Sequence, residues 1–124
     1  MNTNLVNSLV LAYIGDAVYE VEIRKFLIIK GINKVNDLQK EAINYVSAKN
    51  QCVFINEMIN NNVLTEEELD VVKRGRNSKV LSHPKNVNIQ EYKWATALES
   101  LFGYLYLNEN NDRINELINI IVGD

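Results

Sequence analysis

Helical periodicity is the feature that most constrains what this sequence can fold into. Apolar residues recur at intervals of three and four along most of the chain, as on the buried face of an amphipathic helix. A single proline and five glycines interrupt the 124 residues, so long helices can run with few breaks. With 47% hydrophobic and 23% charged residues, the chain can bury a core. We therefore expect an all-α helical bundle, built as one domain over residues 1–124.

Polar residues and glycines predict where these helices begin and end. Thr65 and Glu68 have the spacing of a capping box, and Gly31 and Gly75 are suitable C-terminal stops. The capping box gives the acids at 66–68 a structural role, so we do not expect them to bind a metal. The apolar stripe over 14–30 is wide, which predicts a mostly buried central helix. The expected helices span 4–13, 14–30, 35–61 with a kink or break at 47–50, 65–75, 91–107 and 111–122.

Charge is distributed unevenly along the chain. Five cations lie between Lys73 and Lys85, and no acid occurs from Val71 to Gln90. The formal net charge is -3, so this segment carries +5 and the remainder carries -8. The asymmetry predicts either a local contact with an anionic partner or an ordinary solvated basic loop. Residues 76–90 contain Pro84 and read as a loop, and loops of that length are often functional.

Cysteine usage and the N-terminal segment bear on compartment and on site classes. Cys52 is the only cysteine and cannot form an internal disulfide, which favours a reducing compartment such as the cytoplasm. The first residues lack a basic region and a long apolar run, so we expect neither a signal peptide nor a membrane span. Cys52 and His83 stand alone, which excludes a zinc-ligand pattern. No glycine-rich phosphate loop and no serine–histidine arrangement is recognisable.

Two carboxylates lie in otherwise apolar helical stretches. Asp16 interrupts "LAYIGDAVYE", and Glu99 is the only acid in "YKWATALESLFGYLYL", residues 92–107. A buried charge must be neutralised, paired or bound to a metal. Gly103 lies on the same helix face as Glu99 and favours close packing of a second helix. Two acid-bearing helices packed together would bring Asp16 and Glu99 within reach of one cation, and oxygen ligands suit Mg²⁺ or Mn²⁺.

Each of these acids also has a purely structural interpretation. Asp16 follows a glycine and can cap a helix. Glu20 and Arg24 are spaced as an i,i+4 ion pair, and Glu99 can hydrogen-bond a neighbouring helix or subunit. If the acids do bind a metal, a basic loop that holds phosphates beside it would support metal-dependent phosphodiester hydrolysis.

Five segments of the sequence, taken in order, resemble one protein family. They are "LAYIGDAVYE", "VSAKNQ", "RGRNSK", "HPKN" and "ATALESLFGYLYL", and together they resemble Mini-III, the short ribonuclease III-like proteins of bacteria. The resemblance implies the all-helical ribonuclease III endonuclease domain without an appended double-stranded RNA-binding domain. It also implies a homodimer that cleaves double-stranded RNA with Mg²⁺, for which Mn²⁺ can substitute. The associated role is maturation of the ends of 23S ribosomal RNA precursor, with a ribosomal protein as a candidate presenter of the substrate.

The resemblance also assigns roles to individual residues. Asp16 and Glu99 fall on the two acids that are catalytic metal ligands in the family. Ala12 and Thr96 stand where full-length ribonuclease III enzymes have a glutamate and an aspartate, which argues against a four-carboxylate, two-metal site. Nothing in the resemblance assigns a role to Glu20. The missing acids keep open a catalytically silent module that binds ribosomal RNA, and a plain helical interaction domain remains a third reading.

The basic segment gains a role in the same way. Double-stranded RNA is recognised mainly through its shape and backbone, so cations and polar groups near the acids are expected to contact phosphates and 2′-hydroxyls. With few cations, we expect modest, salt-sensitive affinity. Ser47 and Lys49 are weaker candidates. The expected RNA-binding residues are Lys73, Arg74, Arg76, Asn77, Lys79 and Lys85.

Overall fold

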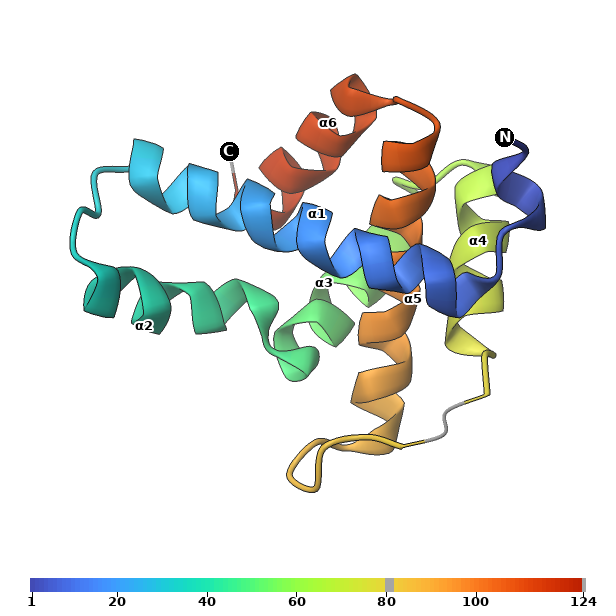
Figure 1. Ribbon diagram of the computed structural model, residues 1–124, viewed down its shortest axis with the longest axis horizontal. Coiled ribbons are helices and arrows are strands. Elements are labelled where there is room, and N and C mark those ends of the chain that lie inside the picture. Colours follow the sequence, from blue (N-terminus) through green and yellow to red (C-terminus); the bar gives the residue numbers. More distant parts are fainter. Residues whose placement is uncertain (80–81, 124) are drawn as a thin grey trace.

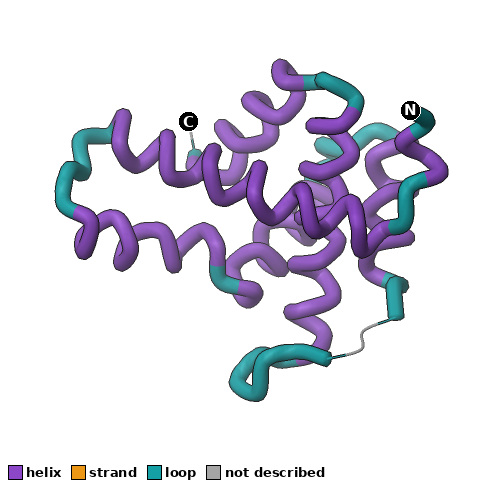
Figure 2. Tube along the Cα trace, viewed as in Figure 1, coloured by secondary structure: helices purple, strands orange, loops and turns teal. Residues whose placement is uncertain are grey.

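The fold consists of six α-helices, seen in a computed structural model that describes residues 1–79 and 82–123 (Figures 1 and 2). A short 3-10 turn over Thr3–Leu5 precedes them. The helices are α1 (Ser8–Ile29), α2 (Val35–Val46), α3 (Ala48–Asn60), α4 (Glu66–Arg76), α5 (Ile89–Leu107) and α6 (Asn111–Val122). The described ranges contain no β-strand, so the all-α prediction is confirmed.

Helix α5 forms the centre of the molecule. It packs against α1, α3, α4 and α6, and Figure 1 shows α1 crossing it. Every residue of α5 from Ala95 to Leu105 except Glu99 is buried. Tyr19 of α1 packs edge-on against Phe102 of α5, with ring centroids 5.2 Å apart. The second central helix expected from the sequence is therefore the one that organises the core.

Helix α1 is continuous, and the expected boundary between residues 13 and 14 is wrong. The Asn7 side chain accepts a hydrogen bond from the Leu9 amide at 2.8 Å and starts the helix. Gly15 does not break it, because tight packing against α5 holds this part of the backbone. Asp16 lies well inside the helix, so the structure excludes its interpretation as a cap.

The expected break between residues 47 and 50 is confirmed at Ser47. Ser47 has an extended backbone conformation, ends α2 and caps α3 by accepting the Asn50 amide at 3.3 Å. Side chains satisfy carbonyl groups that the end of α2 leaves free. The Tyr19 hydroxyl donates to the Tyr45 carbonyl at 2.7 Å, and the Gln51 amide donates to the Val46 carbonyl at 3.0 Å.

The predicted start of α4 is confirmed, but the predicted stop at Gly75 is wrong, because the helix continues to Arg76 and Asn77 is its C-cap. Thr65 and Glu68 form the capping box of α4. Glu68 also bonds Arg113 of α6 at 2.8 Å, and this pair fastens α6 to α4. Burial raises the pKa of Glu68, but the bonds from Arg113 and Thr65 outweigh it and leave the pKa below its usual value. Helix α5 begins two residues before the expected start, because Asn88 caps it, and α6 has its predicted bounds.

Helix α1 is less buried than its apolar stripe predicts. Val21 is 58% exposed and Ile28 is 59% exposed, whereas Ile23 and Leu27 are fully buried. The stripe covers more of the helix than α5 and the neighbouring helices can bury. None of the helices in the described part of the chain is long and apolar enough to cross a membrane.

Candidate active site

The site is built on a close crossing of α1 and α5. A Cβ atom on Gly15 would collide with the Glu99 carbonyl oxygen, and one on Gly103 would collide with the Leu11 carbonyl oxygen. The two backbones therefore touch, as expected for Gly103. Because Asp16 follows Gly15 and Glu99 precedes Gly103 by one turn, the crossing brings these two acids together from helices far apart in sequence.

The electrostatics of Glu99 reflect the nearby Asp16. Burial raises the pKa of the Glu99 carboxyl, and the adjacent Asp16 carboxylate raises it further. Gln51 opposes the shift and Glu20 adds to it weakly, and the resulting pKa is about 9. Burial also raises the pKa of Tyr19, as do the charges of Glu99 and Glu20. The Glu99 carboxyl therefore keeps its proton at neutral pH in the metal-free protein, while the neighbouring Asp16 side chain is exposed to solvent.

The arrangement fits a divalent cation. Within the described ranges, neither Asp16 nor Glu99 forms an ion pair, and Glu20 is paired with Arg24 at 3.2 Å. Two adjacent carboxylates without a cationic partner are the hard oxygen donors that Mg²⁺ and Mn²⁺ accept, and Mg²⁺ completes its shell with water. The described part of the chain contains no group of three or more acidic, histidine or cysteine side chains that could hold a metal ion together.

The positions of the two missing acids offer no replacement ligand. Ala12 is buried at the crossing and has only a methyl side chain. The Thr96 hydroxyl donates to the Tyr92 carbonyl of its own helix at 2.9 Å. The candidate site therefore has two carboxylates, Asp16 and Glu99, and Glu20 is close enough to affect Glu99 electrostatically.

Among the predicted RNA-binding residues, Arg76 has the most defined position. Its guanidinium lies 4.9 Å from the centroid of the Trp94 ring, a cation–π contact. It also bonds the side chains of Asn77 at 3.1 Å and Gln90 at 3.4 Å. Trp94 was not expected to contribute, because no pattern links two residues eighteen positions apart on different helices.

The other expected RNA-binding residues differ in availability. Arg74 is half-buried and paired with Asp70 at 3.2 Å, so it is partly neutralised. Ser47 serves as a helix cap and Lys49 is exposed. Three lysines are exposed and form no ion pair within the described part of the chain: Lys73, Lys79 and Lys85.

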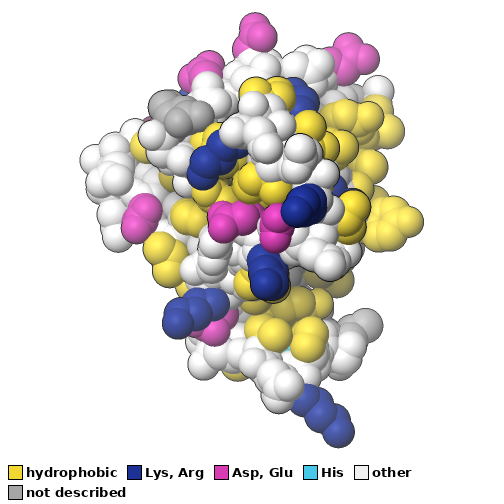
Figure 3. All heavy atoms as spheres, turned by 90° about the vertical axis from the view of Figure 1, so that its left-hand side faces the viewer, with side chains coloured by type: hydrophobic (Ala, Val, Ile, Leu, Met, Phe, Trp, Pro, Cys, Tyr) yellow, Lys and Arg dark blue, Asp and Glu magenta, His cyan; other side chains and the backbone are white. Residues whose placement is uncertain are grey.

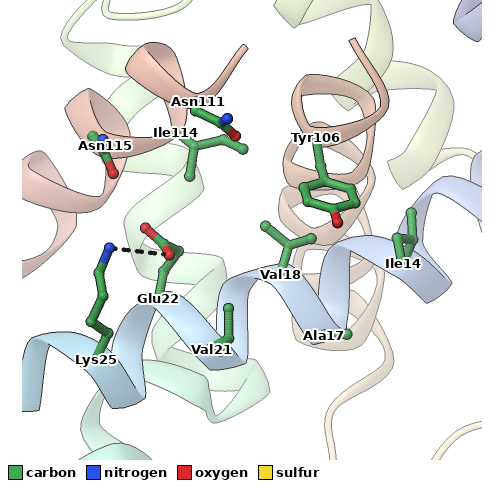
Figure 4. A pocket seen from close by; sticks show the side chains of 10 residues that line it. All are labelled: Ile14, Ala17, Val18, Val21, Glu22, Lys25, Tyr106, Asn111, Ile114 and Asn115. Atoms are coloured by element: carbon green, nitrogen blue, oxygen red, sulfur yellow. Dashed lines mark ion pairs between the residues drawn. The ribbon is translucent and has the colours of Figure 1, made fainter. Parts of the chain in front are cut away.

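A hollow of about 500 Å³ lies between α1, the end of α5 and the start of α6 (Figure 4). Apolar side chains of α1 and the Tyr106 ring line it, and Lys25 and Glu22 form a 3.7 Å ion pair at one side. The face seen from the α1–α2 turn mixes apolar, basic and acidic side chains and is not uniformly basic (Figure 3).

Known proteins share this fold and sequence. Residues 9–110 match the Ribonuclease III domain family. The chain is 50% identical to Mini-ribonuclease 3 of Brevibacillus brevis, covering 93% of this chain and 84% of that protein. It is 43% identical to Mini-ribonuclease 3 of Streptococcus pneumoniae, covering 95% and 92%. A crystal structure of a Fusobacterium nucleatum protein superposes with a TM-score of 0.84 at 37% identity, covering 95% and 94%. The chain therefore belongs to the Mini-ribonuclease 3 group of the ribonuclease III domain family, the endoribonucleases of ribonuclease III type.

Proposed function

We propose that the protein is a Mg²⁺-dependent endoribonuclease that cleaves double-stranded RNA, with Mn²⁺ as a functional substitute. The observation that carries this proposal is the meeting of Asp16 and Glu99 at the α1–α5 crossing, without a cationic partner in the described ranges. Bound Mg²⁺ would supply a hydroxide nucleophile and neutralise charge on the phosphoryl oxygens. Asp16 and Glu99 hold the ion, and their rigid helices keep the two carboxylates in register.

The basic residues would bind the RNA backbone beside this site. Arg76 is pre-positioned by Trp94, and Lys73, Lys79 and Lys85 are exposed for phosphate contacts. Arg74 and Asn77 complete the proposed set. The natural substrate we propose is 23S ribosomal RNA precursor in the cytoplasm, presented by a ribosomal protein. The basis for that substrate is the family resemblance.

A homodimer is part of the same proposal. Helix α1 exposes apolar side chains that a monomer would leave in water, including Tyr13 at 83% exposure and Val21 at 58%. The hollow in Figure 4 lies along the same helix. A projecting side chain and a hollow on one helix suit a two-fold contact, in which each copy presents both features to the other. Two catalytic sites would then face the two strands of one duplex.

Cleavage assays with matched variants test the catalytic proposal. We expect Asp16→Asn and Glu99→Gln to reduce Mg²⁺-dependent cleavage of a precursor duplex by at least 100-fold, while circular dichroism shows the same fold. Asp37→Asn on α2 and Glu57→Gln on α3 replace exposed acids and are expected to cleave normally. Undiminished cleavage by either site variant would refute the assignment of its acid.

A second candidate function is favoured by the small number of acids. With Ala12 and Thr96 in place of acids, the domain would bind ribosomal RNA without cutting it. RNA binding without product after hours in Mg²⁺ or Mn²⁺ would support this silent module over the enzyme. Appearance of defined RNA ends that require the metal would exclude it.

A further inference from the structure

His83 is the only histidine of the chain, and its ring rests on the ring of Tyr92 in the first turn of α5. The ring centroids lie 6.1 Å apart with an interplanar angle of 34°, which is within the range of favourable aromatic contacts. The His83 side chain is exposed and Tyr92 is half-buried. Within the described ranges, His83 forms no ion pair. The loop before α5 therefore presents an imidazole that one ring supports and that solvent reaches.

Helix geometry places this imidazole on the same side of α5 as Glu99. Successive α-helical residues are about 100° and 1.5 Å apart, so Tyr92 lies about 20° around the helix from Glu99 and about 10 Å along its axis. Trp94, which carries the contact with Arg76, lies about 140° around the helix from Glu99. The two ring contacts thus flank different sides of the start of α5. The contact made by His83 is the one on the side of the acid.

The charges around His83 favour an anionic partner. The loop belongs to the segment 71–90, which contains no acid, and Figure 1 shows the loop beside the start of α5, beyond the crossing of α5 with α1. The charged side chains nearest to His83 along the loop and beside Tyr92 on α5 are Lys79, Lys85, Glu91 and Lys93. Three of these four are cations. An imidazole that is protonated between pH 5 and 8 adds a further positive charge to this group.

We propose that His83 binds the backbone of the RNA duplex on the acid side of α5, and that the Tyr92 ring fixes its position. The inference rests on the proposed function, because it requires a duplex that lies over Asp16 and Glu99. The imidazolium of His83 donates a hydrogen bond to a phosphate oxygen, whereas the neutral ring has no charge to contribute. Lysines keep their charge across this pH range, so His83 is the contact that makes RNA affinity rise as pH falls.

Filter binding of a duplex RNA to the full chain in EDTA, over a salt series at about pH 5.5 and about pH 8.5, tests this contact. His83→Phe keeps a ring on Tyr92 and removes the charge. One phosphate contact corresponds to a salt slope of about 0.9, which is about 8-fold in affinity at roughly 0.1 M salt. At the lower pH we therefore expect His83→Phe to bind about 8-fold more weakly than the wild type, with a slope smaller by about 1. At the higher pH the difference should fall below about 2-fold.

Lys85→Gln is the matched control, because Lys85 is an exposed cation of the same loop that does not titrate in this pH range. It should weaken binding equally at both pH values. Tyr92→Leu keeps the charge of His83 and removes its support, so it should weaken binding at the lower pH with an unchanged salt slope. If His83 only packs the loop onto Tyr92, His83→Phe will bind like the wild type at the lower pH, and the proposal is overturned. A pH dependence that persists unchanged in His83→Phe would overturn it too.

The same measurements separate this inference from the proposed function. If Lys85→Gln weakens binding while His83→Phe binds like the wild type at the lower pH, the role of His83 is refuted and RNA binding by the loop stands. If the wild type does not bind duplex RNA at low salt at either pH, the proposed function itself is wrong, and the role of His83 falls with it.

Discussion

Gly15 and Gly103 face each other's helices at the crossing of α1 and α5. A Cβ on Gly15 would lie 2.7 Å from the Gly103 amide nitrogen, besides colliding with the Glu99 carbonyl. Neither helix can therefore carry a side chain at this point. The spacing of Asp16 and Glu99 is set by two main chains in contact, which is more rigid than spacing set by packed side chains.

Substituting either crossing glycine should destabilise the protein severely. We expect Gly15→Ala and Gly103→Ala each to lower the free energy of unfolding by about 3 kcal/mol or more, because backbone atoms cannot move aside. Gly75→Ala is the milder comparison, since its Cβ would meet the Ser100 Oγ at 2.8 Å and the Ala97 Cα at 3.0 Å, whereas the closest backbone atoms lie far nearer to a Cβ on Gly15 and Gly103. Urea denaturation should rank Gly75→Ala as the mildest, and the reverse order would contradict the account of the crossing.

Replacing the ionisable carboxyl of Glu99 with an amide should stabilise the metal-free protein. The folded pKa of about 9 lies above the unfolded value, so the folded state retains a proton that the unfolded state releases. The wild type therefore loses stability as pH rises from about 4.5 to 9. Glu99→Gln has no ionisable group at this position and does not undergo this loss. It should therefore be more stable than the wild type by roughly 1–3 kcal/mol near pH 8 in EDTA.

Thermal melts across pH measure this difference. The difference in stability between Glu99→Gln and the wild type should vanish near pH 4, where both proteins are neutral at this position. At pH 8, excess Mg²⁺ should reduce the difference by stabilising the wild type. Glu57→Gln, at an exposed site on α3, should show no such pH dependence. An advantage that stays constant from pH 4 to pH 9 would rule out the raised pKa as its source.

Arg76 and Trp94 should affect RNA binding in distinguishable ways. Arg76→Ala removes a charge and should weaken binding of a duplex while reducing the salt slope by about 1. Trp94→Leu keeps the charge but removes the ring that orients it, so binding should weaken with an unchanged salt slope. Filter binding over a range of salt concentrations measures both, with Lys40→Ala on α2 as the control. Identical salt slopes for wild type and Arg76→Ala would exclude a phosphate contact.

The exposed face of α1 should control oligomeric state. We expect the wild type to sediment as a dimer and Tyr13→Glu and Val21→Glu to sediment as monomers, because each places a charge in the proposed contact. Ile43→Glu changes a residue of similar exposure, 60%, on α2 and should remain dimeric. A monomeric wild type, or dimeric Tyr13→Glu and Val21→Glu proteins, would contradict this surface assignment.

Most helix boundaries could be predicted because local chemistry decides them. The capping box at Thr65 and Glu68, the break at Ser47 and the bounds of α6 all depend on side chains within a few positions. The expected division of α1 at residues 13 and 14 was wrong because Gly15 suggests a break locally. A glycine is required at position 15 because α1 contacts α5, which lies more than eighty residues away in the sequence. A local sequence pattern cannot reveal that contact.

The site could be predicted only in part. Asp16 and Glu99 stood out because a carboxylate in an apolar helix needs an explanation, and that signal is present in the sequence. Trp94 gave no such signal. Tryptophan is common in cores, so only the three-dimensional contact shows that its ring lies against Arg76.

The helices near the two acids differ in how firmly they are held in place. Helices α1 and α5 are locked by backbone contact and by the core, whereas α2 has no fully buried side chain. The end of α2 nearest the site is tied down by the hydrogen bonds from Tyr19 and Gln51. Local opening of α2 therefore requires far less than global unfolding. Fluctuations of α2 would leave the spacing of Asp16 and Glu99 unchanged, because the backbone contact between α1 and α5 sets it.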